Sequence, residues 1–172
     1  TELEDGRLKD VIYKLADSVQ FPLKKLYTID GSTRSSHSNA FFYGFGNSKM
    51  IVLFDTLITQ VTEGELLAIL GHEIGHWRLW HTIEGFVISQ LYTFLLFLSF
   101  SYFQNSSCLF AAFGFSSTLS STLNKPMPTF VGLLLFMQTY WGPVDKFLTF
   151  LLNINSRKNE FAADQYSKDL GM

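Results

Sequence analysis

The feature that most constrains this chain is a run of 40 residues without a charged side chain, from Gly85 to Asn124. Residues 86–103 would cover about 27 Å as a helix, close to the hydrocarbon thickness of a bilayer, about 30 Å. A second uncharged run begins at Pro126. We therefore predict two transmembrane segments, residues 86–104 and 127–152, that form a helical hairpin. The alternative is a pair of helices buried in a soluble core, but two near-spanning runs are unusual in a chain of 172 residues.

The charged residues lie mainly before this region and after it. Residues 1–85 contain eight Lys or Arg and eleven Asp or Glu, whereas residues 86–156 contain only Lys125, Asp145 and Lys146. The net charge of −2 and the lack of a basic stripe argue against nucleic acid as a partner. Basic residues flank both polar ends of the predicted hairpin, and only Lys125 lies at its turn, Asn124-Lys125-Pro126. The positive-inside rule then places the polar ends in the cytosol. The single cysteine, Cys108, cannot form an intramolecular disulfide.

The segment before the uncharged run has the pattern of a small α+β unit. A helix is predicted over residues 3–19 and a short strand over residues 26–29, followed by a polar loop at 33–38. Two aromatic and β-branched strands, residues 39–45 and 49–54, are predicted to pair through a turn at Gly46. Thr62-Glu63-Gly64-Glu65 is a capping box that begins the next helix. The expected fold is thus mainly α and membrane-embedded, with a small β-hairpin or sheet beside that helix.

This helix contains the motif His72-Glu73-Ile74-Gly75-His76, an H-E-x-x-H sequence. Histidines four residues apart project from one helix face, so both imidazoles can reach one Zn²⁺ at about 2.0–2.1 Å. Glu73 lies about 100° around the helix from His72, beside the metal. It is therefore the expected catalytic base, which takes a proton from a zinc-bound water. An ordinary helix with two surface histidines is the alternative.

A third metal ligand must come from another part of the chain. His81 is one position short of the histidine in H-E-x-x-H-x-x-G-x-x-H, and His37 lies in the predicted polar loop. Among the later acids, Glu160 and Asp164 are four residues apart and share one face of a predicted helix. We assign Glu160 to the metal and Asp164 to a hydrogen bond with a ligating histidine. A solvated helix face is the alternative for this pair.

Four stretches resemble the type I CAAX prenyl protease family, integral-membrane zinc metallopeptidases of the gluzincin kind. They are R-S-S-H-S-N-A-F-F-Y-G-F (34–45), I-V-L-F-D-T-L-I (51–58), A-I-L-G-H-E-I-G-H-W (68–77) and S-R-K-N-E-F-A-A-D (156–164). The resemblance implies one zinc per chain, bound by His72, His76 and Glu160, with Glu73 as base and Asp164 as the motif acid. It also implies that Asn39, Ala40 and Phe41 bind substrate at an edge strand.

The resemblance further implies an endopeptidase that cleaves prenylated C-terminal CAAX proteins or peptides, with membrane lipid around it. The family has more membrane helices before this region and a histidine and an arginine after it. We therefore expect residues 1–172 to be a single metallopeptidase domain of a longer membrane protein. The expected membrane is that of the endoplasmic reticulum, or the inner nuclear membrane, with the site facing the cytosol. The alternatives are a membrane quality-control metallopeptidase for misfolded proteins and a non-catalytic membrane scaffold that retains the motif.

Overall fold

The structure is a computed structural model that describes residues 1–31, 39–46, 48–104, 111–114 and 129–172. The described residues are mostly helical, in agreement with the expected mainly α fold. They form two units, one from Thr1–His81 with Lys158–Met172 and one from Thr82–Arg157. The predicted polar loop at 33–38, the predicted hairpin turn at 124–126 and Cys108 lie outside the described residues.

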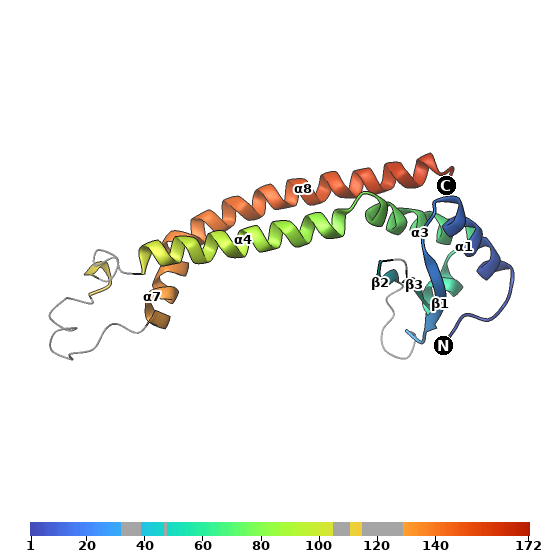
Figure 1. Cartoon of the computed structure of the whole chain (residues 1–172), viewed down its shortest axis with the longest axis horizontal. Coiled ribbons are helices and arrows are strands. Elements are labelled where there is room, and N and C mark those ends of the chain that lie inside the picture. Colours follow the sequence, from blue (N-terminus) through green and yellow to red (C-terminus); the bar gives the residue numbers. More distant parts are fainter. Residues whose placement is uncertain (32–38, 47, 105–110, 115–128) are drawn as a thin grey trace. The chain divides into compact units, whose positions relative to one another are not determined.

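The first unit contains a three-stranded sheet in the order β1-β3-β2 (Figure 1). The strands are β1 (Leu23–Ile29), β2 (Ala40–Phe45) and β3 (Ser48–Phe54). β2 and β3 pair in antiparallel fashion with Phe45 opposite Ser48, which confirms the predicted hairpin. β1 pairs with β3 in parallel, a pairing that the sequence pattern did not predict. Among the described strands, β2 is therefore at an edge of the sheet.

Three helices accompany the sheet, namely α1 (Arg7–Ser18), α2 (Asp55–Gln60) and α3 (Glu63–Arg78). Their apolar faces and the sheet share one core, whose buried members include Ile12, Leu15, Leu26, Ile51, Leu53, Leu57, Leu66, Leu70 and Ile74. α3 begins with the predicted capping box: the Thr62 N–H donates to Glu65 Oε2 at 2.7 Å, and the Glu65 N–H donates back to Thr62 Oγ1 at 3.4 Å. This cap fixes where α3 starts, and hence which side chains face the core.

The core decides the direction in which the histidines of α3 point. Leu70 and Ile74 are buried against the sheet and α1. His72 follows Leu70 by two residues, and His76 follows Ile74 by two, which is about 200° around the helix. Both histidines therefore lie on the side of α3 opposite the core, partly exposed and available to another element.

The second unit consists of α4 (His81–Phe103, which begins one residue before the unit), α7 (Thr129–Phe136), the π-helical turn η1 (Met137–Trp141) and the first part of α8 (Gly142–Asp169). α4 and α8 lie side by side within it (Figure 1), since Tyr92 donates to Asp145 and Asn155 donates to Glu84. Phe100, Phe136 and Trp141 are the buried members of its apolar cluster. Pro143 lies two residues after the end of η1 at Trp141, and its missing N–H accounts for the widened turn there.

One helix in the described part of the chain, α4, is long and apolar enough to cross a membrane by length and composition. Its side chains are largely exposed, and only six per cent of its apolar stretch is buried. Large apolar residues dominate this exposed surface, among them Phe86, Leu91, Phe94, Phe97 and Leu98.

Candidate metal centre

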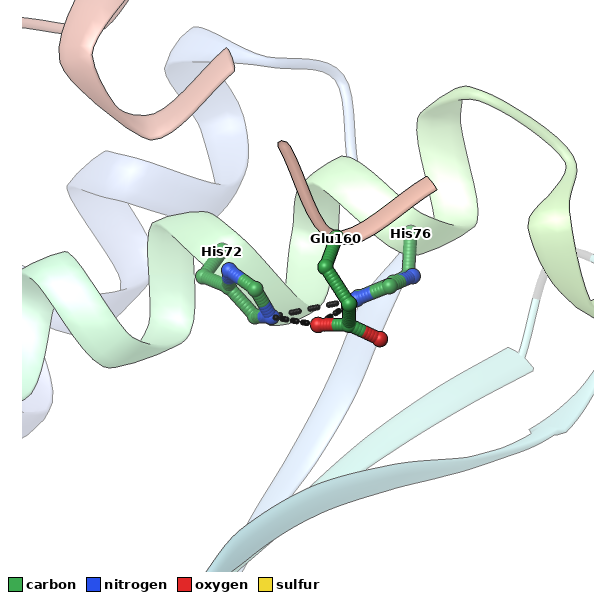
Figure 2. Close-up of side chains that lie close together, drawn as sticks. All are labelled: His72, His76 and Glu160. Carbon is green, nitrogen blue, oxygen red and sulfur yellow. Dashed lines mark hydrogen bonds and ion pairs between the residues drawn. The ribbon is translucent and has the colours of Figure 1, made fainter. Parts of the chain in front are cut away.

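His72, His76 and Glu160 bring their donor atoms together in the first unit (Figure 2). The two Nε2 atoms are 3.0 Å apart. Glu160 Oε2 lies 3.4 Å from Nε2 of His72 and 3.6 Å from Nε2 of His76. The histidines come from α3 and the carboxylate from α8, so two elements far apart in the sequence form the cluster.

The three distances fit one small dication. Ligand atoms about 2.0–2.1 Å from a tetrahedral ion are about 3.3–3.4 Å from one another. The three distances between the donor atoms, 3.0, 3.4 and 3.6 Å, lie around this separation. Two ring nitrogens at 3.0 Å also need a proton or a cation between them. Two imidazoles and one carboxylate form a donor set of catalytic zinc sites, in which a fourth position stays open. The residues present therefore fit a zinc ion.

The carboxylate reaches the histidines because α3 and α8 pack closely. A Cβ built on Gly75 would lie 3.2 Å from both the Cα and the carbonyl oxygen of Ala163. One built on Gly71 would lie 2.9 Å from Ser167 Oγ. On α8 the buried Ala163 and Ser167 alternate with Glu160 and Asp164 along one face, at helical spacing. The two glycines of α3 thus allow the close approach that brings both acids to the histidines.

Asp164 contacts the first histidine of the motif. Its Oδ1 lies 2.8 Å from His72 Nδ1. Because a carboxylate can only accept, His72 donates its Nδ1–H here and keeps a lone pair on Nε2. This Nε2 is the atom that lies 3.0 Å from Nε2 of His76 and 3.4 Å from Glu160 Oε2.

Comparisons with known proteins agree with this geometry. The model of peptidase family M48 matches residues 2–172. The CAAX prenyl protease 1 homolog of Oryza sativa subsp. japonica is 48% identical over 172 residues, 99% of this chain and 38% of that protein. CAAX prenyl protease 1 of Saccharomyces cerevisiae is 43% identical over 178 residues, 99% of this chain and 39% of that protein. The crystal structure of S. mikatae Ste24p superposes with a TM-score of 0.79 at 42% identity, covering 99% of this chain and 40% of that one.

The chain belongs to peptidase family M48. The family resemblance drawn from the four sequence stretches is thereby confirmed. The chain spans about two fifths of the length of the relatives it matches.

In this M48 chain, burial shifts the pKa values of two residues of the H-E-x-x-H motif, Glu73 and His76. Burial raises the pKa of the half-buried Glu73 carboxyl; the charge of His72 opposes this shift, and that of Glu160 adds to it. Burial also lowers the pKa of His76, which favours the neutral imidazole. Neutral imidazole is the form that can ligate a metal.

The three residues expected at the substrate edge lie at the start of β2, and β2 contacts α3. The carbonyl of Asn39 accepts the N–H of Phe54 at 3.0 Å, so the backbone groups of Asn39 face β3. Alternation along an antiparallel strand then turns the backbone groups of Ala40 and Phe42 toward the outer edge. The Ala40 N–H donates to Asn39 Oδ1, and Phe41 is 37% exposed.

Other acids and histidines of the chain have different surroundings. Glu84 accepts from Asn155, and Asp145 accepts from Tyr92. His37 lies outside the described residues. His81 is not one of the three clustered residues, but its Nδ1 lies 3.0 Å from Nδ1 of His76. Sequence reasoning missed this contact because it treated residues 72–81 as one continuous helix.

The packing of α3 on α8 gives a first prediction. Gly75→Val should push the α8 backbone away, destabilise the unit by about 1–3 kcal/mol and separate Glu160 from the histidines. The bound zinc per chain, measured by metal analysis of the purified full-length protein, should fall clearly below the wild-type value.

Gly64 is the matched control, since it lies on the same helix and a Cβ there would meet nothing within 4 Å. Gly64→Ala should keep the wild-type zinc content, and Ala is the better helix former by about 1 kcal/mol. Wild-type zinc content in Gly75→Val would show that the close approach of the two helices is not needed.

Proposed function

We propose that this chain forms the catalytic part of a zinc-dependent endopeptidase that cleaves prenylated C-terminal CAAX proteins or peptides. The observation that carries the proposal is the convergence of two imidazole nitrogens and one carboxylate oxygen at the spacing of a tetrahedral ion. His72, His76 and Glu160 would hold one zinc per chain. The names of the relatives, CAAX prenyl protease 1 and its homologs, support the substrate class.

A zinc ion held there by His72, His76 and Glu160 would supply Lewis-acid chemistry, polarising a carbonyl and lowering the pKa of water. Glu73 would accept a proton from the attacking water and later return it to the amine of the leaving peptide. Its raised pKa suits both tasks, because a carboxyl that ionises closer to neutral pH can accept a proton and return it. Asp164 holds the His72 ring by accepting its Nδ1–H.

The edge of β2 is the proposed place for the peptide. An extended substrate would pair with the outward carbonyl of Ala40 and the outward backbone groups of Phe42 as an added strand, since the Ala40 N–H already donates to Asn39 Oδ1. The Asn39 amide has its oxygen engaged by the Ala40 N–H, so its NH₂ group is the part that would donate to the substrate. Phe41, on the same strand, offers an exposed apolar surface.

The apolar helices would span the membrane. α4 has 23 residues, a length of about 34 Å, which exceeds the hydrocarbon thickness of about 30 Å. Residues 127–152 would form the second span. Arg78, Arg157 and Lys158, which lie outside the two spans, favour polar ends in the cytosol. The endoplasmic reticulum or the inner nuclear membrane is the proposed location.

The contact between Asp164 and His72 gives a second prediction. Asp164→Ala removes the acceptor of the His72 Nδ1–H, so the zinc affinity should fall about 10–100-fold. Asp169→Ala is the matched control on the same helix, because Asp169 accepts a hydrogen bond from Gln165 and not from a histidine of the cluster. Competition with a chelator of known affinity measures both variants. Equal affinities would remove Asp164 from the site.

The full-length protein and a farnesylated CAAX peptide test the proposed function. We expect mass spectrometry to detect removal of the last three residues, and we expect a zinc chelator to abolish it. Added zinc should restore the cleavage. A protein that binds zinc yet leaves the farnesylated peptide intact would contradict the proposal.

The same peptide without its farnesyl group distinguishes the alternative enzyme. Equal cleavage of both peptides would favour a quality-control peptidase for misfolded proteins, which shares the zinc residues but has no need of the lipid. A wild type that binds no zinc would instead favour a non-catalytic scaffold.

A further inference from the structure

Besides the three clustered donors and Asp164, the imidazole of His81 lies at the candidate metal centre. Its Nδ1 lies 3.0 Å from Nδ1 of His76, and the two rings meet edge to face with centroids 5.0 Å apart. His76 presents its other nitrogen, Nε2, to His72 and Glu160. His81 therefore contacts His76 on the side away from the clustered donor atoms.

A break in the helix brings His81 to this position. Five residues along a continuous helix turn the chain by 500°, so position 81 would point about 140° away from position 76. Instead α3 ends at Arg78, the Trp80 N–H donates to the carbonyl of Trp77, and α4 begins at His81. Trp80 makes this turn with a φ of 64°.

That conformation is costly for a bulky residue. The left-handed region disfavours a side chain other than glycine by about 1–2 kcal/mol, and such turns at helix ends usually carry glycine or asparagine. Trp80 is also 69% exposed, so burial of its own side chain does not offset the cost. A strained backbone conformation is often found where it positions a functional side chain. Here the turn at Trp80 places His81 in contact with His76.

The need for a partner at His76 Nδ1 follows from the chemistry of the ligand. A histidine that binds metal through Nε2 must carry its proton on Nδ1, and an acceptor there fixes both the tautomer and the ring. Asp164 fills this role for His72 at 2.8 Å. Among the described residues, the hydrogen-bond partner at His76 Nδ1 is His81, at a comparable distance.

We propose that His81 is a positioning residue of the metal centre, which accepts the Nδ1–H of His76 and so holds its Nε2 lone pair toward the metal. This inference rests on the proposed zinc site. The two motif histidines thus have different supports, a carboxylate from α8 for His72 and an imidazole from the start of α4 for His76.

Zinc affinity of the full-length protein tests this role, measured by chelator competition. His81→Leu removes the acceptor and should weaken zinc binding about 10–100-fold. His81→Gln restores an acceptor oxygen and should recover most of the loss. Thr82→Ala, at an exposed neighbouring position, should match the wild type. The visible spectrum of the cobalt-substituted protein should change in His81→Leu and remain unchanged in Thr82→Ala.

The outcomes separate this inference from the proposed function. Wild-type affinity in His81→Leu would overturn the role of His81 and leave the zinc site standing. Equal losses in His81→Leu and His81→Gln, with a lowered melting temperature of the zinc-free protein, would assign His81 to packing and also overturn it. A wild type that binds no zinc would overturn both proposals.

Discussion

Glu73→Gln is expected to leave zinc bound while it lowers the rate of peptide cleavage about 10²–10⁴-fold. Glutamine has nearly the same shape as glutamate, so α3 and its two histidines should keep their positions. Its amide cannot take a proton from water or return one to the leaving amine. The measurement is the rate of cleavage of a farnesylated peptide, alongside the zinc content of the same sample.

Glu63→Gln is the matched control for this substitution. Glu63 lies on the same helix, where it pairs with Arg7 at the surface, and its loss should leave cleavage unchanged. Turnover by Glu73→Gln at the wild-type rate would remove Glu73 from the role of base. A simultaneous loss of zinc would assign it to the integrity of the site instead.

His76→Ala is expected to reduce the zinc content from about one per chain to near none, and to abolish cleavage. The substitution removes one of the three proposed ligands, and the two that remain come from different helices. His76 also lies between His72 and His81, so its loss interrupts the contacts of both rings. Metal analysis after dialysis against a weak chelator measures the effect.

Arg78→Ala is the matched control on the same helix, because Arg78 follows the H-E-x-x-H motif and its side chain is exposed. It should retain zinc and activity. Zinc retained at the wild-type level in His76→Ala would contradict the assignment of this histidine as a ligand.

The elements with a strong local signal could be predicted from the sequence. The capping box at Thr62, the strands on both sides of Gly46 and the helix through the histidines all depend on residues near one another in the chain. Helical spacing likewise predicted that Glu160 and Asp164 share a face, and the structure brings both to the histidines. Their roles toward a metal stay predictions.

The features that depend on distant residues could not be predicted in the same way. The parallel pairing of β1 with β3 joins strands with β2 between them in the sequence, and alternation within one strand does not identify its neighbour. The short helix α2 was also missed, because six residues are too few to show a helical period.

The contact of His81 with His76 was hidden for a different reason. A helix end is usually marked by glycine or asparagine, and the break between α3 and α4 has Trp80 in the left-handed conformation instead. Without that marker, helical geometry turns His81 away from the site. Its rejection as a third ligand agrees with the clustered residues, yet its role near the site depends on a turn with no sequence signal.

The X-ray absorption spectrum of zinc in the purified full-length protein tests the proposed metal centre most directly. We expect about one zinc per chain, with two imidazole nitrogens at about 2.0–2.1 Å and the remaining ligands oxygen. A protein without zinc, or a zinc bound by sulfur at about 2.3 Å with no imidazole in its shell, would contradict it.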